Sequence, residues 1–204
     1  MKSSLLPLLL AIVLSGEALA GSDPVAATTV PQVEVRRALV YDFVEGGYTQ
    51  ISHPGSFDLY GGYLSGSISP INNVFLYGRV AGYGGSDNAL DVSVGAGLYI
   101  PLTNPNSTPT IDLTLAVGYG YFGLDRENSS TNSLLITPGF RAKFCHCFEW
   151  NGQVLYYHNS DTDAVALGTG VVYYLSDHFG IAANYSYDLD DDSHFFQVGA
   201  RSIW

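Results

Sequence analysis

Residues 90–100, LDVSVGAGLYI, and residues 111–121, IDLTLAVGYGY, decide the fold of this chain. In both segments apolar side chains alternate with polar or small ones, so that one face is apolar and the other carries Asp, Ser, Thr and Gly. Alternation with a period of two is typical of a β-strand with an apolar environment on one side only. The same pattern recurs in residues 140–144, 148–157 and 181–187. The sequence therefore predicts an all-β protein.

The composition indicates where the apolar faces point. Of the 204 residues, 47% are hydrophobic and 13% are charged, whereas an average soluble domain has roughly 25% charged residues. No long apolar run follows residue 20, which excludes a bundle of membrane-spanning helices. The net charge of -11 argues against nucleic acid as a partner, because nucleic acid is itself acidic. These observations favour a closed β-barrel whose apolar face contacts lipid.

We predict a closed antiparallel transmembrane β-barrel of ten strands. The alternative is eight strands, which applies if the first hairpin is misassigned. The predicted strands span residues 39–51, 56–69, 73–84, 89–102, 109–124, 133–144, 148–159, 164–175, 179–188 and 194–204. With an even number of strands, both ends of the chain are expected in the periplasm.

The N-terminal residues have the features of an export signal. A basic start is followed by an apolar run over residues 5–14 and a small-x-small pattern at residues 18–20. We expect residues 1–20 to be a Sec signal peptide, residues 21–37 to be a disordered periplasmic leader, and residues 38–204 to form the barrel. An exported membrane protein without apolar helices is expected in the outer membrane of a Gram-negative cell.

The chain ends in FFQVGARSIW, residues 195–204. With Trp204 facing lipid, alternation turns Gln197 and Arg201 into the lumen. This ending, together with YDFVEGGY at residues 41–48, resembles the small outer-membrane β-barrel proteins of the OmpA/OmpX-like and porin-like group. The resemblance implies that Trp204 is an assembly signal read by the barrel-assembly machinery. It also implies escort by periplasmic chaperones and contact with outer-membrane lipid and lipopolysaccharide.

Charged side chains on the predicted lumen face form the first candidate site. They need partners, because a charge held away from water is costly unless it is paired. We predict an ion-pair network that fills the lumen, with Glu45 and Arg201 meeting where the first and last strands close the barrel. A narrow polar path for ions or small solutes is the alternative. The predicted members are Glu45, Arg79, Asp91, Asp112, Arg141, Lys143, Glu149 and Arg201.

Aromatic residues near the strand ends are interpreted as girdles at the two membrane interfaces. The girdle at the periplasmic end is predicted to hold Tyr41, Tyr77, Tyr173, Tyr174, Phe144, Phe148, Trp150 and Trp204. The outer girdle is predicted to hold Tyr48, Tyr83, Tyr121 and Tyr187.

The acidic excess gathers in the predicted outer loops. Asp188, Asp190 and Asp192 have a D-x-D-x-D spacing, which makes this a candidate cation-binding loop. However, Ser193 and Gly199 stand where an EF-hand has its Gly and its Glu. A solvated acidic loop is the alternative, and we predict neither a metal centre nor a cofactor.

Cys145, His146 and Cys147 occupy a predicted periplasmic turn. The periplasm is oxidising, so we predict a disulfide between Cys145 and Cys147. Binding of a soft metal by the two thiolates and the imidazole is the alternative, although a closed site usually has four ligands.

His158-Asn159-Ser160 resembles the H-x-S motif of outer-membrane lipid A deacylases. Such a pair needs an acidic residue that orients the His. Val172 stands at the place where that acid is expected, and Asp161 and Asp163 lie nearby on a predicted loop. A lipid A-modifying hydrolase is therefore only an alternative.

Asp192 and His194, together with Asp188 and Asp190, resemble the catalytic pairs of omptin proteases. Those pairs lie on opposite barrel walls, whereas these residues crowd one short hairpin. We therefore predict a non-enzymatic barrel with a structural or surface-interaction role, in envelope integrity, adhesion or host contact. A small-solute channel is the second hypothesis.

Overall fold

The computed structural model describes residues 39–204 with short gaps at 55–56, 105–106, 126–128 and 161–162. The predicted signal peptide and periplasmic leader lie outside the described residues. Among the described residues, no helix has the length and apolar character needed to cross a membrane.

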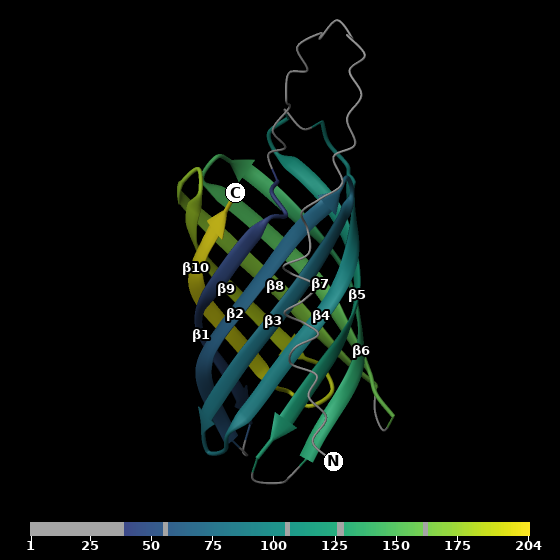
Figure 1. Ribbon diagram of the computed structural model, residues 1–204, viewed down its shortest axis with the longest axis vertical. Coiled ribbons are helices and arrows are strands. Elements are labelled where there is room, and N and C mark those ends of the chain that lie inside the picture. Colours follow the sequence, from purple (N-terminus) through teal and green to yellow (C-terminus); the bar gives the residue numbers. More distant parts are fainter. Residues whose placement is uncertain (1–38, 55–56, 105–106, 126–128, 161–162) are drawn as a thin grey trace, which may run out of the picture. The chain divides into compact units, whose positions relative to one another are not determined.

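The described chain forms ten antiparallel strands that close into a barrel (Figure 1). Strands that follow one another in sequence are paired, and the first strand pairs with the last. The strands are β1 (Phe43–His53), β2 (Phe57–Ile71), β3 (Val74–Gly85), β4 (Ala89–Pro101), β5 (Thr110–Leu124), β6 (Ser129–Cys145), β7 (Phe148–His158), β8 (Asp163–Ser176), β9 (Phe179–Asp188) and β10 (His194–Ile203). The predicted ten-stranded barrel is confirmed, and the eight-stranded alternative is excluded.

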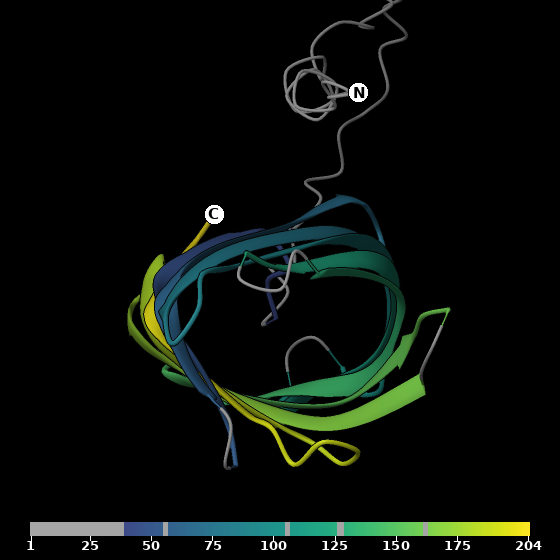
Figure 2. The same cartoon turned by 90° about the horizontal axis from the view of Figure 1, so that it is seen from below.

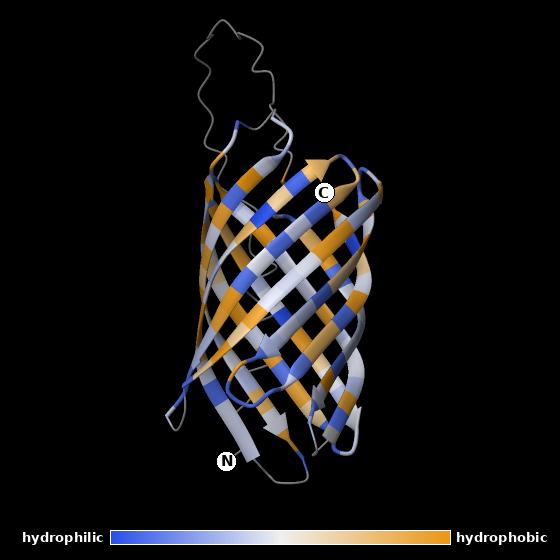
Figure 3. Cartoon of the chain, turned by 180° about the vertical axis from the view of Figure 1, so that it is seen from behind, coloured by the Kyte–Doolittle hydropathy of each residue, from blue (hydrophilic) through white to orange (hydrophobic). Residues whose placement is uncertain are grey.

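The wall of the barrel carries the alternation that the sequence shows, with orange and blue residues alternating along the strands (Figure 3). On β4, Leu90, Val94 and Leu98 are each 41–53% exposed on the outside. Each of the remaining nine strands also carries exposed apolar side chains on the outside of the barrel. A soluble monomer rarely exposes so large an apolar surface, whereas a lipid-facing barrel wall requires it. The structure is therefore that of a transmembrane β-barrel.

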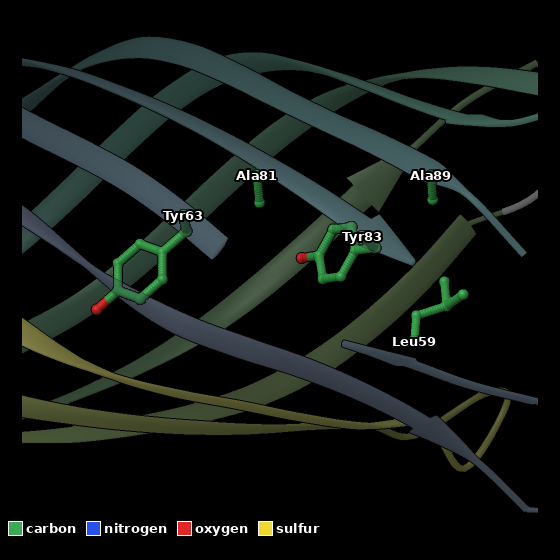
Figure 4. Packing of buried hydrophobic residues seen from close by; sticks show 5 residues of the cluster. All are labelled: Leu59, Tyr63, Ala81, Tyr83 and Ala89. Carbon is green, nitrogen blue, oxygen red and sulfur yellow. The ribbon is translucent and has the colours of Figure 1, made fainter. Parts of the chain in front are cut away.

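The two ends of the barrel differ in the segments and side chains that lie there. Leu39 and Trp204 lie at the end where β1 starts and β10 finishes, which we call the terminal end. The connection from β1 to β2 lies at the other end, which we call the loop end. The interior near the loop end is packed by a cluster from β2, β3 and β4 (Figure 4). Its members are Leu59, Tyr63, Ala81, Tyr83 and Ala89.

Two predicted strand starts are wrong. β1 begins at Phe43 rather than at residue 39, because residues 39–42 turn into the lumen and leave the wall. The start of the described chain, coloured purple, lies inside the ring of strands in Figure 2. β6 begins at Ser129 rather than at residue 133, because its polar first residues pair with the end of β5.

Candidate functional site: the charged lumen

Closure of the barrel brings Glu45 and Arg201 together. The two residues are directly paired between β1 and β10. Arg201 donates from Nε and Nη2 to Glu45 Oε2 at 2.7 and 2.6 Å. Both side chains are buried. Glu45 also accepts hydrogen bonds from the Tyr63 hydroxyl at 2.7 Å and from Asn184 Nδ2 at 3.3 Å. A carboxylate with this many donors is fixed in position.

The pair continues into a longer chain of charges. Arg141 donates from Nε and Nη2 to Glu149 Oε1 at 2.8 and 2.7 Å. Arg201 Nη1 lies 3.9 Å from the same oxygen, and Tyr174 donates to Glu149 Oε2 at 2.9 Å. The order Arg141–Glu149–Arg201–Glu45 alternates in sign and carries no net charge. Alternation of this kind offsets the cost of taking four charges out of water.

A second ion pair lies nearer the loop end. Arg79 on β3 pairs with Asp91 on β4 and donates to the Tyr83 hydroxyl at 3.0 Å. Its guanidinium lies 5.0 Å from the centroid of the Phe195 ring. The side chains of Arg79 and Asp91 are 17% and 23% exposed, so this pair is wetter than the Glu149 chain.

The other two predicted network members contact aromatic rings. Asp112 Oδ2 accepts a hydrogen bond from the Tyr41 hydroxyl at 3.1 Å. Lys143 Nζ lies 4.6 Å from the centroid of the Tyr174 ring. The lumen therefore holds cations over aromatic faces as well as cations beside carboxylates, and both arrangements stabilise a charge away from water.

Several tyrosines assigned to the membrane girdles lie in the lumen instead. Tyr41, Tyr83 and Tyr174 are almost fully buried. The Tyr77 ring packs on the lumen side against the Gly95 and Gly118 positions, which leave room for it. The girdle assignment of these four tyrosines is wrong. Alternation could have placed Tyr77 in the lumen, because Tyr77 shares its strand face with Arg79. Tyr173 faces lipid, as predicted.

The acidic residues of the candidate cation loop do not converge. Asp188 Oδ1 accepts from the Asp190 amide, Asp190 Oδ2 accepts from the Val165 amide, and Asp192 accepts from the Tyr187 hydroxyl. Among the described residues, no three His, Cys, Asp or Glu side chains are placed to hold a metal ion. The cation-loop hypothesis stays a prediction, and in the structure these carboxylates accept hydrogen bonds that shape the turn.

The two cysteines lie side by side in the turn between β6 and β7. Their Sγ atoms are 2.7 Å apart. The hydrogen bond from Cys147 lowers the pKa of Cys145. The disulfide stays a prediction, and the geometry brings its two sulfurs within reach of each other.

The residues of the deacylase-like motif lie at the loop end of β7. His158 Nδ1 and Asp163 Oδ1 are 2.6 Å apart, and both side chains are exposed. Val172 is fully buried in the lumen, on the far side of the wall from His158. Asp163, which the sequence analysis placed nearby on a loop, is the first residue of β8 and is paired with His158.

The omptin-like residues form no catalytic pair of that kind. His194 Nδ1 is 2.8 Å from the Tyr185 hydroxyl, and Asp192 binds Tyr187.

Trp204, the predicted assembly signal, is 61% exposed at the terminal end, and its amide donates to the Asp42 carbonyl at 3.4 Å.

No family model and no curated protein sequence matches the chain. Solved structures of outer-membrane β-barrel proteins resemble it. The KdgM porin is 11% identical with a TM-score of 0.46, over 79% of this chain and 99% of that one. Neisserial surface protein A is 16% identical with a TM-score of 0.41, over 80% and 96%. The transport unit of the autotransporter AIDA-I from Escherichia coli is 11% identical with a TM-score of 0.46, over 84% and 92%. At such identities the likeness concerns the barrel fold alone.

Proposed function

We propose that the chain is a non-enzymatic integral outer-membrane β-barrel that is closed to solutes. Its role is structural or surface-interactive, in envelope integrity, adhesion or host contact. The observation that carries this proposal is the buried, neutral chain Arg141–Glu149–Arg201–Glu45 in the lumen. An open pore would keep such charges hydrated, whereas here tyrosines and the opposite charges replace water.

The orientation follows from the charge of the two ends. The acidic turns, including Asp87, Asp125 and Asp190–Asp192, lie at the loop end. We place the loop end outside the cell, where divalent cations that bridge lipopolysaccharide can also neutralise these carboxylates. The terminal end then lies in the periplasm. Density-gradient separation of inner and outer membranes tests the location, and recovery with the inner membrane would refute it.

Planar-bilayer recording tests closure. The purified full chain should give no discrete openings. The matched variant Glu45→Ala/Arg201→Ala removes the closing pair without changing the net charge and should leak. Discrete, stable openings of the wild-type protein would refute the closed barrel and support the small-solute channel.

A lipid A-modifying hydrolase is a further candidate, and one observation favours it. His158 and Asp163 are hydrogen-bonded on the exposed outer rim, two residues from Ser160. A serine, a histidine and an orienting carboxylate are the parts of an acyl-transfer site. Mass spectrometry of lipid A from cells that carry the wild-type gene or Ser160→Ala tests this candidate. Identical lipid A in both, and in cells without the gene, removes it.

A further inference from the structure

Residues 39–42, which we call the strap, leave the barrel wall and enter the lumen at the terminal end. Leu39 and Tyr41 are only 2% and 4% exposed. The pairing of β1 with β2 and β10 starts at Phe43. The strap precedes the first paired residue, so contacts other than the β-ladder hold it in place.

The strap is held from the far side of the barrel. The strand order makes β6 the fifth strand from β1 in either direction. Arg141 on β6 donates from Nη2 to the Val40 carbonyl at 3.0 Å, and its guanidinium lies 4.4 Å from the centroid of the Tyr41 ring. The Tyr41 hydroxyl reaches Asp112 on β5 at 3.1 Å. The strap therefore crosses the lumen from the wall it belongs to toward the opposite wall.

Aromatic stacking completes the seat of the strap. The Tyr41 ring stacks on Tyr99 of β4, with centroids 4.1 Å apart and planes 8° apart, and on Phe75 of β3 at 5.2 Å. Leu39 joins the same buried cluster. Asp42 fixes the strap at the wall, because its carboxylate accepts from the Ser69 amide at 2.6 Å.

The strap and the ion-pair chain fill different parts of the lumen. Glu149, Arg201 and Glu45 come from β7, β10 and β1. The residues that grip the strap come from β3, β4, β5 and β6. Arg141 belongs to both groups, since it binds Glu149 and Val40. Loss of the strap would expose the β3–β6 side of the lumen and leave Arg141 and Asp112 facing it.

We propose that the strap is a stopper that closes the terminal end of the lumen, and that its withdrawal opens a polar path for small ions. The inference rests on the proposal that the wild-type barrel is closed. It adds that closure depends on the strap as well as on the ion pairs of the wall. The path would run past Asp112, Arg141 and Lys143.

Planar-bilayer recording of the full-length Leu39→Ala/Tyr41→Ala variant tests the stopper. The matched control is Tyr173→Ala/Leu175→Ala, which removes the same side chains from the lipid face at the same end. We expect a gain of discrete openings in the strap variant and none in the control. A folded strap variant that stays closed overturns the inference and leaves the closed-barrel proposal standing.

Thiol labelling provides a second test that does not depend on conductance. In a Cys145→Ser/Cys147→Ser background, Leu39→Cys should be protected from a charged, membrane-impermeant maleimide. Leu102→Cys, on an exposed position at the same end, should react fast. Equal labelling rates at residues 39 and 102 overturn the stopper. Channel openings of the wild-type protein would refute the closed-barrel proposal instead. Protection of residue 39 from labelling would then decide whether the strap lies in the lumen.

Discussion

Replacing Glu149 by glutamine should destabilise the barrel by about 3–5 kcal/mol, the usual cost of removing one partner from a buried ion pair. Glu149 is fully buried. Its carboxylate accepts from Arg141 Nε at 2.8 Å and from the Tyr174 hydroxyl at 2.9 Å, and lies 3.9 Å from Arg201 Nη1. Glutamine keeps the shape of the side chain. However, Glu45 is then the remaining carboxylate for the two arginines of the series Arg141–Glu149–Arg201–Glu45. One buried positive charge is then uncompensated.

Urea unfolding of the full chain in lipid vesicles measures this loss. Tryptophan fluorescence reports the transition, because Trp150 follows Glu149 on β7 and its side chain faces lipid. Unfolding transfers that indole from lipid to water and shifts its emission to the red. The midpoint for Glu149→Gln should fall well below that of the wild-type protein.

The matched control is Asp91→Asn, which removes a carboxylate from the partly exposed pair with Arg79. We expect that variant to lose less than Glu149→Gln does, because water reaches its ion pair. In the double variant Glu149→Gln/Arg141→Met the lumen is neutral again, so its loss should be smaller than the sum of the two single losses. Equal losses of unfolding free energy for Glu149→Gln and Asp91→Asn would refute the view that the four buried charges stabilise the barrel.

Three further outcomes are expected. Gly61→Ala should reduce the heat-modifiable folded fraction, since its Cβ would lie 1.8 Å from the Gly82 carbonyl oxygen, whereas Gly82→Ala meets no atom within 4 Å and should fold normally. In the reduced protein near neutral pH, Cys145 should be alkylated faster than Cys147, because its lowered pKa gives more thiolate as pH rises; equal rates by peptide mass spectrometry would contradict this. Trp204→Ala should lower the yield of barrel inserted in the outer membrane, and an unchanged yield in membrane fractions would count against its role as an assembly signal.

The barrel itself could be predicted because its information is local. On β4 and β5, alternate positions face opposite sides of the wall, so residue type indicates whether a position faces lipid or lumen. Adjacent segments repeat the same pattern independently. The meeting of Glu45 with Arg201 also followed, since a closed barrel must pair its first and last strands. Burial of these charges inside the lumen then left each of them in need of an opposite charge.

The strap could not be predicted from its own residues. Leu39, Val40 and Tyr41 include residue types that favour strands, so the local sequence favours an extension of β1. What places the strap in the lumen is its partners, Asp112 and Arg141, which lie 71 and 101 residues away. Contacts of such separation leave no periodic trace in a single sequence. The sequence put Asp163 near His158, but their direct pairing could not be predicted, because it depends on the register of β7 against β8.

The distribution of charge separates two tasks of the molecule. Within the described residues, the basic side chains are Arg79, Arg141, Lys143 and Arg201, and all four lie on the lumen face. In the sequence, Arg126 is the basic residue that stands among the acidic loop-end residues. We therefore expect mobile cations from solution to neutralise most of the remaining acidic charge at this end. Interactions at the loop end should therefore respond to ionic strength, because exposed charges are screened over about 10 Å at 0.1 M salt. The buried ion pairs are shielded from that screening, so salt should alter surface binding while leaving closure of the lumen unchanged.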